Sequence, residues 1–195
     1  GKPIVQSGAT PATVSDAGEM MPTTATTTLV LGGARSGKSR FAESLAREPM
    51  LPRLYLATAT AGDAEMRARI AHHRARRGDD WRTIEVPLNL VETLERESGA
   101  GRVVLVDCLT LWLSNLMHAG RDVAAETRRL ADRLRAVPGP VIAVSNEVGL
   151  GLVPETPLGR DFRDAQGRLN QAVAAAVTNV VFIAAGLPFW LKRHS

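Results

Sequence analysis

The residues with the clearest chemical meaning form a glycine-rich segment that ends in Lys-Ser and fits the phosphate-binding pattern G-x-x-x-x-G-K-[ST] at every fixed position. Residues 28–31 directly before it are apolar or β-branched and predict a buried parallel strand, and residues 38–48 predict a helix. Backbone N–H groups and the helix dipole of such a unit bind phosphate oxygens. Lys38 then reaches the β- and γ-phosphates, and the Ser39 hydroxyl binds a bridging Mg²⁺. The segment, called the phosphate loop below, is Gly32, Gly33, Ala34, Arg35, Ser36, Gly37, Lys38 and Ser39.

A second run of residues suits the metal ion of such a site. Residues 103–106 are aliphatic, and Asp107 follows them. In the Walker-B arrangement, a buried strand of this kind ends in a carboxylate that holds Mg²⁺ or its water ligands beside the phosphate loop. Strands also end in acidic residues that cap a helix, and a glycine-rich turn with a surface lysine can imitate the loop. The two motifs together favour a nucleoside triphosphate site with Ser39 and Asp107 as metal ligands.

A basic helix is predicted from residue 63 to about residue 75. Met66 and Ile70 form its apolar stripe, His73 lies on that stripe, and His72 points away from it. Two interpretations remain open at this stage: a solvated basic face with a core histidine, or a nucleotide site with a reactive imidazole. The arginines in and after this helix are Arg67, Arg69, Arg74, Arg76, Arg77 and Arg82.

Apolar strands alternate with amphipathic helices along the rest of the chain. Strands are predicted over residues 53–58, 81–86, 103–107, 141–145 and 179–184, with a short seventh over 189–191; helices are predicted over 108–116, 122–136 and 158–177, with another after Asn89. Asn89 and Glu92 predict a capping box for that helix. This order indicates an α/β fold of the P-loop type, with three layers and a mostly parallel sheet of about seven strands.

The chain is predicted to hold one domain. Residues 1–27 are rich in Thr, Ala, Gly, Ser and Pro without apolar periodicity, which predicts a flexible tail, and residues 28–195 form a single nucleotide-binding catalytic domain. Small residues 57–60 end the second strand, where they either admit a base or ribose or simply make a turn. The long loop at residues 146–157 is typical of functional loops, although many such loops only connect.

Composition narrows the class of protein. The chain has 195 residues, is 45% hydrophobic, carries a net charge of +4, and has no apolar run long enough to span a bilayer. The positive charge is compatible with binding to nucleic acid, but only 4% of residues are aromatic. Nucleoside phosphates are a sufficient anionic partner to account for the charge. The single Cys108 excludes an internal disulfide and suits the cytoplasm. We therefore expect neither nucleic acid nor a membrane as partner.

Taken together, the motifs resemble one family, the bifunctional adenosylcobinamide kinase/adenosylcobinamide-phosphate guanylyltransferases of cobalamin biosynthesis. The Walker motif is generic, whereas a His-His pair followed by an Asn-Glu-Val-Gly loop is much more specific. The matching stretches are spread over nearly the whole of residues 28–192: they are residues 32–40, 55–58, 69–73, 81–83 with Glu85, 146–149 with Gly151, Val153 and Pro154, and 162–164 with Gly167, Asn170 and Gln171.

This resemblance implies a RecA-like P-loop fold, a homotrimer and two reactions. The first phosphorylates the aminopropanol hydroxyl of adenosylcobinamide with ATP or GTP. The second transfers GMP from GTP to adenosylcobinamide phosphate, which releases pyrophosphate and gives adenosylcobinamide-GDP. A histidine is guanylylated first in the second reaction, and the matching residue is His73. A neutral imidazole is a credible nucleophile toward the α-phosphate at cellular pH.

The resemblance also implies the residues of the site. Lys38 and His73 are the expected catalytic residues, whereas His72 is expected to be structural. Arginines beside the triphosphate offset charge as pyrophosphate leaves. Besides the phosphate loop, the expected nucleotide contacts are Ala57, Thr58, Ala59, Arg74, Ala75, Arg76, Arg77, Glu85 and Asp107.

Two other readings compete with this one. In the first, the chain is a single-step P-loop kinase of a small molecule, and His73 only packs or binds substrate. In the second, it is a nucleotide-regulated binding module whose arginine-rich helix contacts nucleic acid, with strongly salt-dependent affinity. The low aromatic content and the lack of a recognised nucleic-acid motif disfavour the second reading.

Overall fold

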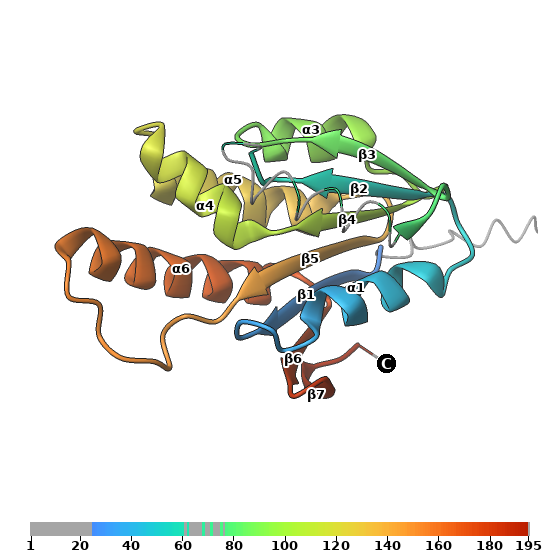
Figure 1. The fold of residues 1–195 in the computed structure, drawn as a ribbon. Helices are drawn as coiled ribbons and strands as arrows, with labels where there is room; N and C mark the ends of the chain where they lie inside the picture. The colour runs from blue at the N-terminus through green and yellow to red at the C-terminus, as the bar shows by residue number, and fades with distance from the viewer. Residues whose placement is uncertain are drawn as a thin grey trace, which may run out of the picture.

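The computed structural model describes residues 25–60, 62, 68, 71, 75 and 77–194. These residues form a seven-stranded sheet with helices on both faces (Figure 1). The strands are β1 (Thr27–Gly32), β2 (Arg53–Ala57), β3 (Trp81–Glu85), β4 (Val103–Asp107), β5 (Val141–Asn146), β6 (Asn179–Ala184) and β7 (Leu187–Lys192). The helices are α1 (Lys38–Arg47), α3 (Leu90–Glu97), α4 (Leu109–His118), α5 (Val123–Ala136) and α6 (Pro157–Ala176).

The sheet confirms the predicted, mostly parallel P-loop architecture. Its strand order is β3-β2-β4-β5-β1-β6-β7, and every neighbouring pair is parallel except the β6–β7 hairpin. The strand before the phosphate loop, β1, and the strand that ends in Asp107, β4, are separated by β5 alone. Because the strands are parallel, the phosphate loop, Asp107 and the end of β5 all lie at the carboxyl edge of the sheet.

The two faces of the sheet have separate apolar cores. Residues of α3, α4, α5 and α6 pack on one face, around the fully buried Trp112, whose indole Nε1 donates to the Leu88 carbonyl at 2.8 Å. The opposite face carries α1 and the side chains of Tyr55, Ala57 and Trp81. Trp112 thus belongs to the core, as the apolar sequence around it predicts. No helix in the described ranges is long and apolar enough to cross a membrane.

The start of β1 is fixed by residues from the far end of the chain. β1 begins at Thr27, one residue before the predicted strand. The Thr27 N–H donates to Thr178 Oγ1 at 2.9 Å, the Thr178 N–H donates to Thr27 Oγ1 at 3.0 Å, and Thr178 Oγ1 donates to the Thr27 carbonyl at 2.8 Å. β1 therefore joins the loop before β6 through both backbone and side-chain bonds.

Two local expectations differ from the structure. The predicted capping box is wrong, because the Asn89 side chain makes no capping hydrogen bond and the Glu92 carboxylate accepts from Arg129 of α5 at 2.6 Å. That hydrogen bond holds the pKa of Glu92 below its usual value, so a contact between helices replaces the local cap. The short strand expected over 189–191 is instead the six-residue β7, which pairs antiparallel with β6.

Candidate nucleotide-binding and catalytic site

The phosphate loop turns tightly between β1 and α1 and leaves the first turn of α1 open to a ligand. Gly37, the residue before α1, has a φ of 92°, and α1 has no side-chain cap. A Cβ at Gly32 would lie 2.5 Å from Ser36 Oγ and 2.7 Å from the Ile183 carbonyl oxygen. The glycines at the two fixed positions of the pattern are therefore required by its shape, and the uncapped N–H groups of α1 suit a phosphate.

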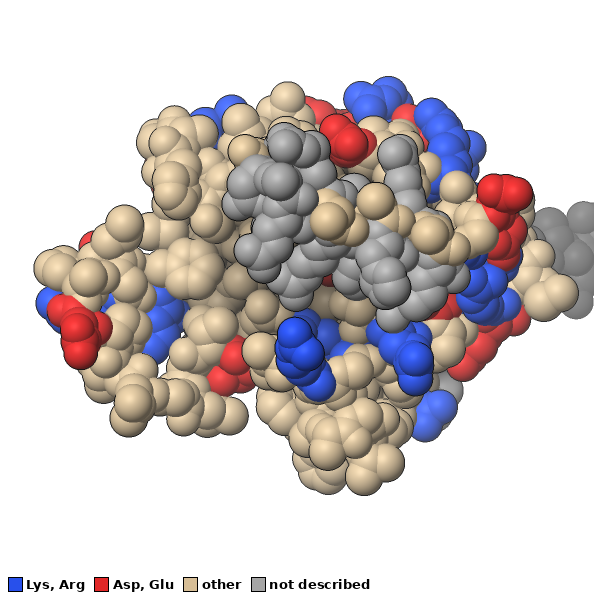
Figure 2. Space-filling model, viewed as in Figure 1, with Lys and Arg blue, Asp and Glu red and all other residues tan. Residues whose placement is uncertain are grey.

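The predicted catalytic lysine folds back over this loop. Lys38 Nζ donates to the Gly33 carbonyl at 2.9 Å. Burial raises the pKa of the Cys108 thiol, directly after Asp107, and the charge of Lys38 acts on the same thiol in the opposite direction. Lys38 is thus close to both the loop and the end of β4. Figure 2 shows other basic side chains on the α1 side of the molecule, where Arg35 and Arg40 are exposed.

The turn of the β6–β7 hairpin contacts the phosphate loop and supports it, a feature that the sequence did not predict. The Gly186 N–H donates to the Ser36 carbonyl at 2.8 Å, and a Cβ at Gly37 would lie 3.3 Å from Gly186 Cα. Ala185 and Gly186 have φ values of 51° and 77°, which gives a two-residue turn with both central residues in the left-handed region. The Ala-Gly pair between two apolar runs was the available signal, but nothing in the sequence indicates that the turn reaches residue 36.

Three predicted nucleotide residues form a row at the carboxyl edge. In the sheet register, Ala57 is the partner of both Glu85 in β3 and Asp107 in β4. Residues in register on parallel strands project to the same face, and Ala57 belongs to the α1-side core. Glu85 is exposed and Asp107 is half-buried, roughly 10 Å apart across two strand spacings. The row therefore offers carboxylates on either side of a small residue, and Ala59 lies partly exposed just beyond it.

Asp107 is held by a tyrosine from the neighbouring strand. Tyr55, 5% exposed, donates its hydroxyl to Asp107 Oδ2 at 2.7 Å. Burial, and then the Asp107 carboxylate, raise the pKa of Tyr55 above its ordinary value, so the phenol remains a donor at neutral pH. The sequence places Tyr55 in a predicted strand and in a stretch that matches the family, but gives its side chain no role. The sequence alone does not show whether a buried tyrosine only packs in the core or also orients a carboxylate on the neighbouring strand.

Arg77, which was predicted to contact nucleotide, lies against this tyrosine. Its guanidinium carbon is 3.4 Å from the centre of the Tyr55 ring, and the residue is 3% exposed. Its Nε and Nη1 atoms are buried without a hydrogen-bond partner in the described structure. A buried cation with unused donors favours an anion nearby. Arg82, in contrast, is an exposed side chain that pairs with Glu97 at 3.3 Å.

Thr58 has a supporting role at the end of β2. It is fully buried; its hydroxyl donates to the Cys108 carbonyl at 2.7 Å and accepts from the Cys108 N–H at 2.8 Å. Its N–H donates to the Asp107 carbonyl at 3.2 Å, and its own carbonyl accepts from Asn115 at 2.8 Å. All polar groups of Thr58 are thus used inside the protein, where they fix the backbone that follows Asp107.

The predicted nucleophile lies outside the described residues. His72, His73, Arg74 and Arg76 belong to that undescribed part, whereas Ala68, Ala71, Ala75 and Arg77 are helical. Ala75 is exposed.

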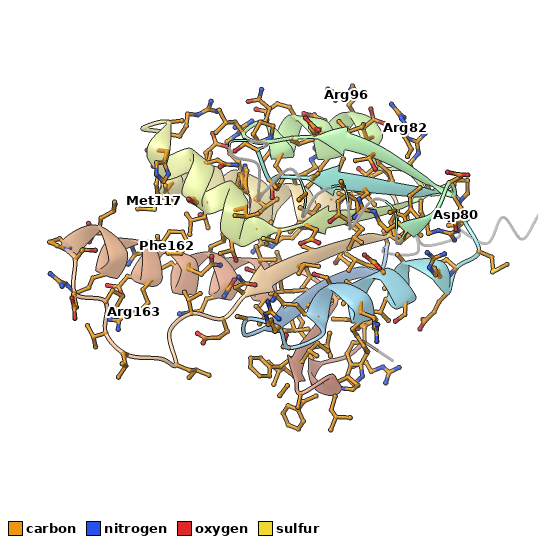
Figure 3. All side chains as sticks on the ribbon, in the orientation of Figure 1. Asp80, Arg82, Arg96, Met117, Phe162 and Arg163 are labelled. Carbon is orange, nitrogen blue, oxygen red and sulfur yellow. The ribbon has the colours of Figure 1, made fainter. Side chains whose placement is uncertain are left out.

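Figure 3 shows the two ends of the sheet. Asp80 lies at the amino end, and Met117 of α4 and Phe162 of α6 lie near the opposite, carboxyl end.

The donor atoms at the carboxyl edge suit Mg²⁺. Ser39 in the first turn of α1 and Asp107 at the end of β4 supply hard oxygen ligands, which Mg²⁺ prefers. Asp107 Oδ2 accepts one hydrogen bond from the Tyr55 hydroxyl, and the carboxylate keeps further lone pairs on both oxygens for an ion or its water. No cluster of three or more His, Cys, Asp or Glu side chains is found among the described residues.

Comparison with known sequences decides the family. Residues 28–191 match the model of the family described as cobinamide kinase / cobinamide phosphate guanyltransferase, CobU. The chain belongs to this family. It is 54% identical over 166 residues to the bifunctional adenosylcobalamin biosynthesis protein CobP of Pseudomonas aeruginosa, with 84% of this chain and 96% of that protein covered. It is 40% identical over 179 residues to the bifunctional adenosylcobalamin biosynthesis protein CobU of Escherichia coli K12, with 84% and 98% covered.

The CobU family match includes every described site residue, from the phosphate loop to Asp107. It also confirms that the chain is a transferase of the kinase and guanylyltransferase type. Among solved structures, the ATPase from a type III secretion system of pathogenic bacteria aligns with a TM-score of 0.54 at 10% identity, over 86% of this chain and 57% of that one. The protein PH0250 of Pyrococcus horikoshii OT3 aligns with a TM-score of 0.55 at 9% identity, over 88% of each chain. These likenesses concern the fold alone, which is a three-layer P-loop fold of the RecA-like type.

Proposed function

We propose that this protein phosphorylates the aminopropanol hydroxyl of adenosylcobinamide with ATP or GTP, and then transfers GMP from GTP to adenosylcobinamide phosphate. The products of the second reaction are adenosylcobinamide-GDP and pyrophosphate. The observation that carries the proposal is the convergence of the phosphate loop, Lys38 and Asp107 at one edge of the sheet in a member of this family.

In the kinase step, the acceptor hydroxyl oxygen attacks the γ-phosphorus. The bond from that phosphorus to the β–γ bridging oxygen breaks, the nucleoside diphosphate leaves with the electron pair, and the hydroxyl proton passes to water. Lys38 and the first-turn N–H groups of α1 stabilise the charge that spreads over the phosphate oxygens. Ser39 and Asp107 would hold Mg²⁺, which would neutralise further charge on the phosphate oxygens.

In the transfer step, a neutral imidazole nitrogen of His73 attacks the α-phosphorus of GTP and pyrophosphate leaves. The resulting phosphoramidate is then attacked by a phosphate oxygen of adenosylcobinamide phosphate, which breaks the P–N bond and frees the histidine. Two displacements replace one difficult transfer between bulky anions. Arg74 and the buried Arg77 are the arginines proposed to offset the charge of the leaving pyrophosphate.

The base of the nucleotide is assigned to the row at the ends of β2 and β3. The exposed Glu85 carboxylate accepts hydrogen bonds from a guanine edge or a ribose hydroxyl, and the small Ala57 and Ala59 let the ring approach the backbone. This assignment gives the Glu85 side chain a role beyond the fold, because that side chain makes no hydrogen bond or ion pair with any described residue.

Labelling with GTP carrying ³²P at the α-phosphate tests the central step. The wild-type protein is expected to form an acid-labile, base-stable protein–GMP adduct, and His73→Ala is expected to lose it. His72→Ala is the matched control and should retain the adduct. An adduct that persists in His73→Ala removes His73 as the nucleophile, and phosphorylation of cobinamide without any adduct would favour the single-step kinase.

We also propose that the protein works as a homotrimer in the cytoplasm. Support comes from the family resemblance and from the exposed apolar side chains of β7, Leu187, Phe189 and Leu191, which are 70%, 68% and 56% exposed. Light scattering coupled to size-exclusion chromatography measures the mass directly, and a monomeric mass at micromolar concentration would contradict the trimer.

A further inference from the structure

The strand between the phosphate loop and Asp107 ends in a polar residue to which no role has been assigned above. β5 lies between β1 and β4, and its last residue, Asn146, is in register with Gly32, the first residue of the phosphate loop. Ligands of parallel sheets bind at the carboxyl ends of such neighbouring strands. The end of β5 therefore lies between the phosphate loop and Asp107, at the edge of the sheet where such ligands bind.

The backbone of Asn146 is fixed from three directions. Its N–H donates to Thr110 Oγ1 of α4 at 2.8 Å, and its carbonyl accepts from Asn170 Nδ2 of α6 at 3.1 Å. The next N–H, that of Glu147, donates to the Gly32 carbonyl at 3.1 Å, which joins the end of β5 directly to the phosphate loop. These bonds hold the residue rigidly without using its side chain.

A buried polar cluster holds Asn170 in turn. Ser145 Oγ donates to Asn170 Oδ1 at 2.7 Å, and Gln166 Nε2 donates to both of those oxygens at 2.9 Å. Ser145 and Gln166 are fully buried. Three polar side chains on the α6 face are thus ordered by hydrogen bonds with one another, and together they position one backbone carbonyl, that of Asn146.

The Asn146 side chain points to the other face. Successive residues of a strand project to opposite faces, and Ser145 projects toward α6. Val144, on the same face as Asn146, belongs to the α1-side core and is the register partner of Asp107. The half-buried Asn146 amide makes no hydrogen bond to any described residue and lies on the face that carries the phosphate loop and Asp107.

We propose that the Asn146 side-chain amide donates a hydrogen bond to a γ-phosphate oxygen of the bound triphosphate, and so positions that phosphate for transfer. The role of this contact in phosphate transfer rests on the proposed function, whereas the contact with the bound nucleotide does not. The amide forms no covalent bond and exchanges no proton. It distinguishes a triphosphate from a diphosphate, and it serves the kinase step at the γ-phosphorus, whereas GMP transfer occurs at the α-phosphorus.

Calorimetric titration with β,γ-imido ATP and with ADP, both with Mg²⁺, measures this contact without any acceptor. A hydrogen bond to a charged oxygen is worth about a tenfold to hundredfold change in affinity. Asn146→Ala should lower the preference for the triphosphate analogue by that factor and leave ADP affinity within twofold. Asn146→Asp should lower it further, because a carboxylate repels the phosphate. Asn179→Ala, the same change at the amino end of β6, is the control and should keep the wild-type preference.

Enzyme assays separate the two reactions. In Asn146→Ala, cobinamide phosphorylation should fall about 10²-fold to 10³-fold, whereas the protein–GMP adduct should still form at saturating GTP. An unchanged preference between triphosphate and diphosphate overturns the proposal, and so does an equal loss of both affinities, which would indicate a distorted loop. If the wild-type protein phosphorylates no cobinamide, the proposed function fails while the binding preference still tests Asn146.

Discussion

Replacing Tyr55 with Phe removes one hydroxyl from the site and leaves its packing in place. The ring keeps its edge contact with Trp81, at 6.1 Å between centroids, and its stacking against Arg77. What is lost is the 2.7 Å hydrogen bond to the Asp107 carboxylate. Bonds to charged groups contribute about 1.5–3 kcal/mol, and since water reaches the half-buried Asp107, we expect the lower end, about 1.5 kcal/mol.

That loss is measurable in two ways. For a domain of this size it lowers the melting temperature by about 3–6 °C. It also leaves Asp107 free to rotate, so the Mg²⁺ concentration needed for half-maximal nucleotide binding should rise. Calorimetric melting and a Mg²⁺ titration of nucleotide binding measure the two effects.

A double-mutant cycle with Asp107→Ala assigns the effect to the proposed bond. If the hydroxyl acts through Asp107, Tyr55→Phe should cost almost nothing once the carboxylate is gone, with a coupling of about 1 kcal/mol or more. Equal costs of Tyr55→Phe in the two backgrounds would refute the reasoning, because they would place the role of the hydroxyl elsewhere.

Three further predictions follow from the same region. Gly32→Ala should abolish nucleotide binding and Gly33→Ala should retain it, because a Cβ meets Ser36 and Ile183 at Gly32 but nothing within 4 Å at Gly33; calorimetry with ADP compares the two. Burial, and then Asp107, raise the pKa of Cys108 to about 11, so native protein at pH 8 should react with iodoacetamide far more slowly than protein in guanidinium; equal rates would contradict its burial. Because the folded-state pKa of Tyr55 is raised, its stabilising contribution holds below the unfolded pKa of about 10 and is lost as pH rises above it. The increase in absorbance at 295 nm that accompanies ionisation of the chain's single tyrosine should therefore occur only as the protein unfolds in alkali, and tyrosinate in folded protein at pH 10.5 would be the contrary result.

The sequence predicts most of the architecture because local patterns determine it. Four aliphatic residues before Asp107 can form only a buried strand beside a phosphate loop, and β4 ends where that pattern ends. The capping box predicted at Asn89 is wrong because a distant contact overrides the local pattern: the partner of Glu92 comes from α5, more than thirty residues away. Local patterns carry no information about such competition.

The site shows the same difference between features that local sequence patterns predict and features that depend on distant contacts. The phosphate loop can be found from the sequence because its glycines and the Lys-Ser pair stand at fixed spacing, and Gly37 has a φ of 92°, which glycine adopts readily. The link from Tyr55 to Asp107 depends on strand order and register, and the support that Gly186 gives to Ser36 depends on a hairpin 150 residues later. Such contacts between distant segments become visible only when the sheet is assembled.

The pairing of Thr27 with Thr178 bears on how the protein is made. β1 is synthesised first, yet both of its neighbours, β5 and β6, come from the last third of the chain. On the ribosome, the segment that cradles the phosphates must therefore wait as an unpaired apolar strand until β5 and β6 have emerged. A chain cut short before residue 178 would contain every Walker residue and still lack a formed nucleotide cradle, so ligand-binding competence itself reports that β6 has been made.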